Sequence, residues 1–137
     1  MATAADHHTA LIYIMVVVSA ADSDMTDREL MTIGEIVRTL PVFRDFDGKK
    51  LAKTAEACAR LLAENNGLEK LLAFTKKAVP ARLRETAYAL ACDVAVADLD
   101  PHQEVLRLLE LLRHRLGLDR LTAAAIERGA RARYATL

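Results

Sequence analysis

Tryptophan is absent from this 137-residue sequence, which has only three phenylalanines and three tyrosines. Proteins that hold single-stranded nucleic acids stack the bases on aromatic side chains, so the sequence is poorly supplied for that role. A net charge is also lacking, because 19 lysines and arginines balance 19 aspartates and glutamates. Without a positive field to attract phosphates, nucleic acid is not expected as a partner.

Cysteine is scarce as well, and both residues, Cys58 and Cys92, stand in apolar stretches. That context predicts two small buried thiols and argues against a disulfide framework or a zinc site. A reducing, cytoplasmic compartment is the default expectation.

The sequence has only five glycines and three prolines, the residues that most often form turns. No dipeptide typical of a β-hairpin separates runs of β-branched residues. Alanine and leucine dominate instead. The sequence therefore predicts an all-α fold, and its length predicts one domain spanning residues 1–137.

Positive charge is missing ahead of the most apolar stretch, "LIYIMVVV" at 11–18. A signal peptide would carry lysine or arginine there, whereas this chain has Asp6, His7 and His8. A membrane span would need about 20 apolar residues. The stretch is therefore predicted to be a buried first helix, with no transmembrane segment.

Helix-start and helix-stop signals divide the chain into about seven helices, which we expect to form a compact bundle. Pro41 stops the second helix, and "NNG" at 65–67 ends the third through a left-handed residue. The first and fifth are apolar nearly all round, which is typical of central helices. The predicted ranges are 8–21, 26–40, 47–64, 68–78, 80–97, 100–117 and 119–134.

The two halves of the chain show an internal similarity. "VVSAADSDMTDRELMTIGEI" and "VAVADLDPHQEVLRLLELL" each join a very apolar helix to an amphipathic one through a short acidic junction. The offset is about 75 residues, without one fixed register. The pattern suggests two pseudo-repeats with the acidic junctions in corresponding positions.

The first junction holds more acidic residues than a helix start requires. Thr26 and Glu29 have the spacing of a capping box, and Asp27 suits the positive end of the helix dipole. Asp22 and Asp24 precede the cap and are not explained by it. Asp22, Asp24, Thr26 and Glu29 are therefore candidate oxygen ligands for Ca²⁺ or Mg²⁺, although the loop is too short for an EF-hand.

The second junction repeats this spacing with Asp98 and Asp100, and Glu104 follows early in the sixth helix. Asp100 is explained as an N-cap before Pro101. Asp93 lies inside "ALACDVAVA", where an ionised carboxylate needs a partner. That partner is a hydroxyl, a helix N-terminus, an arginine of the last helix, or a metal ion.

Other patterns of catalysis and binding are missing. The sequence has no H-E-x-x-H, no G-x-S-x-G and no phosphate-binding glycine loop. The basic run Arg128, Arg131 and Arg133 is predicted to be a solvated face, with anion or partner binding as the alternative.

An apolar helix ending in A-A-D, Thr-x-x-Glu opening the next helix and the later "ADLDPHQEVLRLLELLRHRLGLD" together resemble the tellurite-resistance TerB family. A related domain occurs in a DnaJ-like co-chaperone, and the similarity runs from about residue 10 to residue 133. It implies a compact two-repeat bundle in bacterial stress response. Such domains are binding or scaffolding modules with an acidic, metal-binding surface and no established enzymatic activity.

The family's acidic positions fall on Asp22 and Glu29, and in the second half on Asp93, Asp98 and Glu104. Ser23 stands where the family commonly has glycine, so the loop lacks that residue's freedom to adopt positive φ.

The leading hypothesis is a non-enzymatic TerB-like module with a protein partner and a divalent cation. The candidate metal ligands are Asp22, Asp24, Glu29, Asp93, Asp98 and Glu104. One alternative is a metal-dependent hydrolase built on a helical bundle. Another is a pure adaptor or homodimer that uses an exposed apolar helix face.

Overall fold

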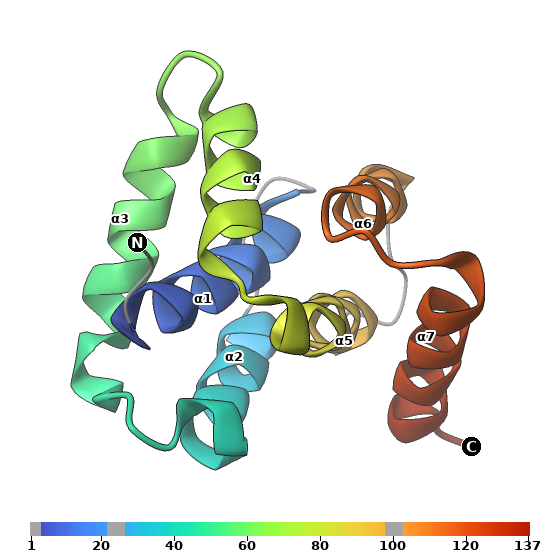
Figure 1. Cartoon of the computed structure of the whole chain (residues 1–137). Coiled ribbons are helices and arrows are strands. Elements are labelled where there is room, and N and C mark those ends of the chain that lie inside the picture. The colour runs from blue at the N-terminus through green and yellow to red at the C-terminus, as the bar shows by residue number, and fades with distance from the viewer. Residues whose placement is uncertain (1–3, 22–26, 98–102) are drawn as a thin grey trace.

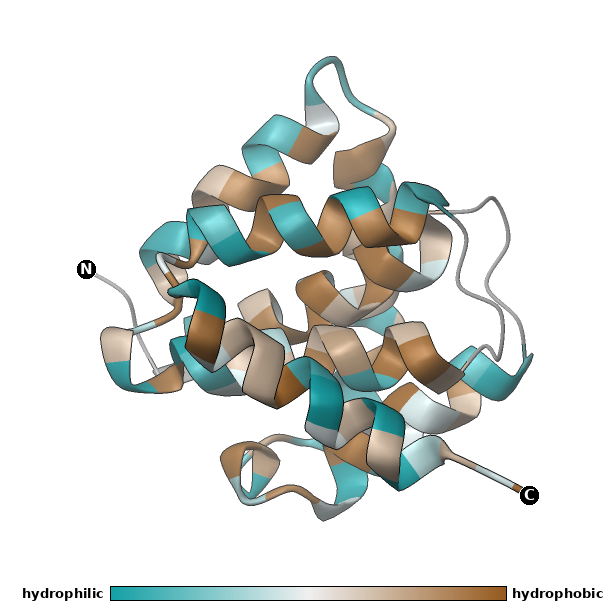
Figure 2. Cartoon of the chain, turned by 90° about the vertical axis from the view of Figure 1, so that its right-hand side faces the viewer, coloured by the Kyte–Doolittle hydropathy of each residue, from teal (hydrophilic) through white to brown (hydrophobic). Residues whose placement is uncertain are grey.

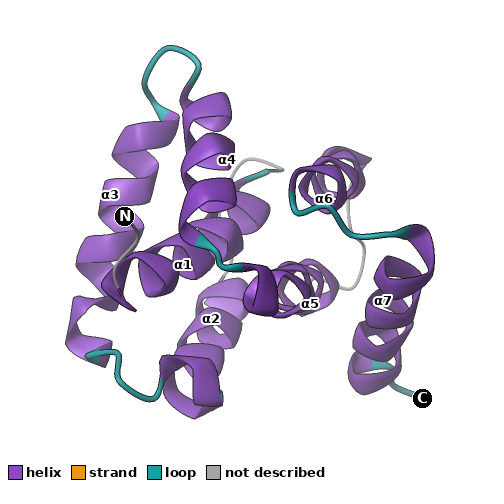
Figure 3. Ribbon diagram, in the orientation of Figure 1, coloured by secondary structure: helices purple, strands orange, loops and turns teal. Residues whose placement is uncertain are grey.

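The computed structural model describes residues 4–21, 27–97 and 103–137, and every regular element within them is helical (Figures 1 and 3). This confirms the predicted all-α fold. The described residues form seven α-helices: α1 (Ala4–Ala20), α2 (Asp27–Thr39), α3 (Leu51–Leu62), α4 (Gly67–Ala78), α5 (Arg84–Ala97), α6 (Gln103–Arg115) and α7 (Arg120–Tyr134). Three short 3-10 helices accompany them: η1 (Pro41–Phe43), η2 (Gly48–Lys50) and η3 (Ala81–Leu83).

Helices α1 and α5 form the centre of the molecule and pack against each other. Leu11, Ile14 and Met15 of α1 are fully buried, as is Ala91 of α5. Each large apolar side chain buried in this way contributes roughly 1.5–3 kcal/mol. The prediction that the apolar stretch at 11–18 is a buried first helix is confirmed. No helix in the described ranges has the length and apolar character that crossing a bilayer requires.

The remaining helices cover these two. Helices α3 and α4 lie side by side on α1, whereas α2, α6 and α7 pack on α5 (Figure 1). Along the outer helices apolar and polar residues alternate, as expected for helices with one buried face (Figure 2). In α6 this face consists of Val105, Leu108 and Leu112, as their spacing predicts.

The helix boundaries differ from the prediction at several points. The expected continuous helices over 47–64 and 80–97 are wrong in their first turns, which are the 3-10 helices η2 and η3. Asp47 does cap its helix, accepting a hydrogen bond from the Lys49 backbone N–H at 3.0 Å. The first helix starts at Ala4, earlier than predicted. Asn66 supplies the expected left-handed residue, with φ of 57°.

Gly67 lies where two backbone segments meet closely. A Cβ atom at this position would lie 2.3 Å from the carbonyl oxygen of Leu61 and 2.7 Å from that of Leu62. Both distances are shorter than van der Waals contact allows, and both atoms belong to the backbone. The turn between α3 and α4 therefore requires glycine.

We predict that Gly67→Ala lowers the free energy of unfolding by roughly 1–3 kcal/mol, because backbone must move to admit the methyl group. Gly34→Ala is the matched control, since a Cβ there has nothing within 4 Å. It should raise stability by about 0.5–1 kcal/mol, because alanine favours the helix. Urea denaturation measures both variants. Unchanged stability of Gly67→Ala would contradict this interpretation of the turn.

Candidate functional site

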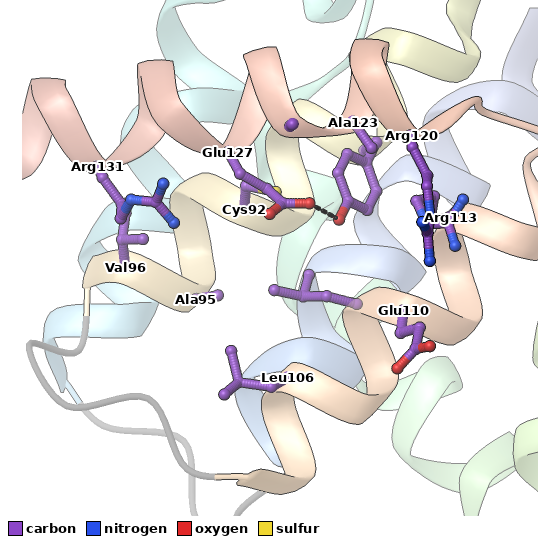
Figure 4. A pocket seen from close by; sticks show the side chains of 13 residues that line it. Cys92, Ala95, Val96, Leu106, Glu110, Arg113, Arg120, Ala123, Glu127 and Arg131 are labelled. Atoms are coloured by element: carbon purple, nitrogen blue, oxygen red, sulfur yellow. Dashed lines mark hydrogen bonds between the residues drawn. The ribbon is translucent and has the colours of Figure 1, made fainter.

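A pocket of about 380 Å³ opens between α5, α6 and α7 (Figure 4). Its floor is apolar and includes Val96, Leu109 and Ala123. Charged side chains also line it: Glu110, Arg113, Arg120, Glu127 and Arg131. The volume and this combination of an apolar floor with a few polar groups are typical of small-molecule sites.

The pocket follows from how the last two helices reach α5. Both pack on α5, yet they make few contacts with each other. Gly117, with φ of 70°, reverses the chain after α6, and Asp119 then caps α7. Because Ala95 and Ala123 are small, their side chains leave space between the three helices.

Tyr88 anchors α7 to α5 in the wall of the pocket. Its side chain is 1% exposed, and its hydroxyl donates a hydrogen bond to Glu127 Oε2 at 2.7 Å. Burial raises the pKa of Tyr88 well above its ordinary value, and the Glu127 carboxylate adds to that rise. The hydroxyl therefore stays protonated and donates to Glu127.

Cys92 is a free thiol beside this pair. Burial, followed by the negative charge of Glu127, raises the pKa of Cys92 to about 12. Cys58 is also free, and burial raises its pKa to about 12. Both thiols are protonated at neutral pH and are poor nucleophiles. The prediction of two small buried thiols is confirmed.

Positive charge is distributed unevenly around the pocket. Figure 4 shows Arg113 and Arg120 at one end, Arg131 at the other and Glu127 between them. Arg113 Nη1 donates to the carbonyl oxygen of Leu118 at 3.3 Å. Arg120 is exposed and forms no ion pair within the described part of the chain.

Another apolar groove lies between α2 and α3, with a volume of about 320 Å³. Val16 of α1, Leu30 of α2 and Leu51 of α3 contribute to it. Among the described residues, Lys49 is the one charged residue that lines this groove. The groove therefore has fewer polar groups to orient and select a ligand than the pocket between α5, α6 and α7.

Asp93, the acidic residue predicted inside an apolar helix, is paired with Arg133 of the last helix. Its side chain is 14% exposed, whereas that of Arg133 is 55% exposed. Burial raises the pKa of Asp93, and the hydrogen bond and charge of Arg133 oppose that rise. Of the partners that the sequence left open, the structure contains the arginine.

Of the other predicted metal ligands, the structure describes Glu29 and Glu104. Glu29 is 3% exposed in the first turn of α2, and Glu104 is exposed in the first turn of α6. Within the described ranges, no three His, Cys, Asp or Glu side chains form a group that could hold a metal ion. Asp22, Asp24 and Asp98 lie outside the described residues. The metal site therefore stays a prediction.

The basic run of the last helix has a divided role. Arg128 is exposed, as a solvated face requires. Arg131 lines the pocket and Arg133 pairs with Asp93, so two of the three residues do more than face solvent.

No family model, curated protein or solved structure matches this chain. The resemblance to the TerB family therefore rests on the sequence motifs alone and stays a prediction.

The sequence reasoning missed the pocket and two of its three arginines, Arg113 and Arg120. One signal was present: Arg120 directly follows Asp119, the N-cap of α7. The positive end of a helix dipole favours acidic residues, and the first turn of α7 has none. A residue that violates a local preference in this way is a candidate functional residue.

We predict that Arg133→Gln lowers stability by about 1 kcal/mol at pH 7, because it leaves a mostly buried carboxylate without its partner. The expected loss of stability is small because Arg133 is half exposed and solvent screens its charge. The folded-state pKa of Asp93 is raised, so protonation on acidification relieves the cost of burying its charge. The destabilisation should therefore shrink as the pH falls through that pKa.

Asp93→Asn is the matched control, because it removes the buried charge and leaves Arg133 in solvent. It should change stability by less than about 0.5 kcal/mol. Urea denaturation of both variants at neutral and acidic pH measures the effects. A loss in Arg133→Gln that grows on acidification would contradict this account of the pair.

Proposed function

We propose that this chain is a non-enzymatic binding module whose ligand site is the pocket between α5, α6 and α7. The observation that carries the proposal is that apolar and charged side chains of three helices line one pocket. A ligand seated there would contact two helices that otherwise touch each other little. Binding would thus stabilise the arrangement of α6 and α7.

The chemistry of the pocket wall favours binding over catalysis. General acid–base catalysis works best with groups whose pKa values lie near the operating pH. Burial raises the pKa of Cys92 to about 12, and that of Tyr88 is raised well above its ordinary value. Glu127 accepts the Tyr88 hydrogen bond. These groups are suited to holding a structure and a ligand in place.

The resemblance to the TerB family supports the same class of function, since it implies a binding or scaffolding module in bacterial stress response. A protein partner whose binding depends on the relative positions of α6 and α7 would fit this role. The metal-dependent hydrolase receives less support, because Glu29, Asp93 and Glu104 form no ligand group within the described residues.

We predict that Ala124→Phe abolishes binding of Nile red, an uncharged apolar dye, to the pocket. Ala124 is exposed and lines the pocket, so phenylalanine can fill the space without disturbing the core. Ala125→Phe is the matched control, because Ala125 is also exposed on α7 and does not line the pocket. The readout is dye fluorescence in a titration. Equal binding by both variants, or no saturable binding by the parent, would contradict the proposal.

The divalent cation is tested separately. We predict that calorimetric titration with Ca²⁺ or Mg²⁺ gives saturable heat with the parent chain, because the carboxylates that are close in sequence at the first junction are the kind of oxygen ligand that hard cations prefer. The Asp22→Asn, Glu29→Gln double variant should lose it. Mn²⁺ and Zn²⁺ serve as comparison ions. Absence of heat and of a thermal shift with every ion would remove the cation from the proposed function.

A further inference from the structure

The two ends of the α5–α6–α7 pocket differ in how their charges are compensated. At one end the pocket is lined by one positive and one negative side chain, Arg131 and Glu127 of α7. At the opposite end, Arg113 and Arg120 lie together in the pocket lining (Figure 4). A ligand with its own negative charge would be favoured at that end.

A third guanidinium group, that of Arg84, lies near Gly117 in the turn between α6 and α7. Arg84 lies at the start of α5, and its Nη1 atom is 3.6 Å from the position that a Cβ of Gly117 would occupy. Its Nε atom is buried and has no hydrogen-bond partner within the described residues. The segment that joins α6 to α7 is therefore bordered by Arg84, Arg113 and Arg120.

Two acidic residues are close in sequence to Arg113 and Arg120: Glu110 and Asp119. Asp119 already forms hydrogen bonds within α7. Asp119 accepts hydrogen bonds from the backbone N–H of Thr122 at 2.7 Å and from its hydroxyl at 3.1 Å. These bonds lower the pKa of Asp119 and cap α7. Glu110 is exposed and has no ion pair within the described residues. Positive charge therefore exceeds negative charge at this end.

The helix dipole adds to this excess. The N-terminus of α7 carries a partial positive charge, and Arg120 stands in the first helical position. A cation there is locally unfavourable, and a bound anion would relieve the repulsion.

We infer that the pocket takes a small amphipathic anion, with its head group at Arg113 and Arg120 and its apolar body on the floor formed by Val96, Leu109 and Ala123. This inference rests on the proposed function and specifies its ligand. The head group is a carboxylate or a phosphate monoester, since arginine binds both through paired hydrogen bonds. At the opposite end the charge of Arg131 is matched by that of Glu127, so that end attracts an anion less strongly.

The test compares ligands of equal chain length by calorimetry on the full chain. Octanoate and octyl phosphate carry the two candidate head groups, 1-octanol is uncharged, octylammonium is positive, and acetate lacks the apolar body. We expect at least one of the two anions to bind about tenfold more tightly than octanol or octylammonium, and acetate not to bind measurably. The tighter of the two anions identifies the head group.

Variants at the arginine end should change anion binding in opposite directions. Arg120→Gln should weaken binding of the preferred anion about fivefold, because it removes one charge-assisted contact. Glu110→Gln should strengthen it about twofold, because it removes a competing negative charge. Arg128→Gln, exposed on α7 and outside the pocket, should leave it unchanged. Because octanol carries no charge, its binding should change less than that of the preferred anion in the Arg120 and Glu110 variants.

Arg120 and Glu110 are exposed, so their variants are expected to fold. Equal affinity for octanol and both anions, or unchanged anion binding in Arg120→Gln, would overturn the inference. If Nile red still binds and Ala124→Phe still blocks it, the proposed binding module stands in that result. Failure of Nile red and of all the octyl ligands to bind would instead overturn both.

Discussion

The fold depends on covering α5 on every side. Its apolar residues face all directions, and an apolar helix in water is stable only when neighbouring helices bury those faces. Helix α1 covers one side and is itself covered by α3 and α4. Helices α2, α6 and α7 cover the rest (Figure 1). The last two meet α5 along different faces, and the small alanines between them leave the pocket open.

Polar interactions then fix α7 at the edge of this core. Tyr88 of α5 donates to Glu127, and Asp93, about one and a half turns farther along α5, pairs with Arg133. Both bonds join the same two helices, so the position of α7 is set by directional contacts as well as by apolar burial. The α7 wall of the pocket is therefore fixed before a ligand binds, which reduces the cost of ordering that wall on binding.

The sequence predicted the helices well because their signals are local. The spacing of Val105, Leu108 and Leu112 gives the buried face of α6, and Asn66 supplies the left-handed end of α3. The charge of Asp93 required a partner, and an arginine of the last helix was among the alternatives. The pocket could not be predicted, since it depends on the separation of α6 and α7 and on which alanines face that space. The metal prediction falls largely on Asp22, Asp24 and Asp98, outside the described residues.

The most direct test of the central claim is the position of a bound ligand relative to the three helices. Intermolecular nuclear Overhauser effects between unlabelled octanoate and methyl-labelled protein report that position. The account predicts contacts from the octanoate chain to the methyl groups of Val96, Leu109 and Ala123, one from each of the helices α5, α6 and α7. Contacts confined to Leu30 and Leu51 in the other groove, or no contacts at all, would contradict it.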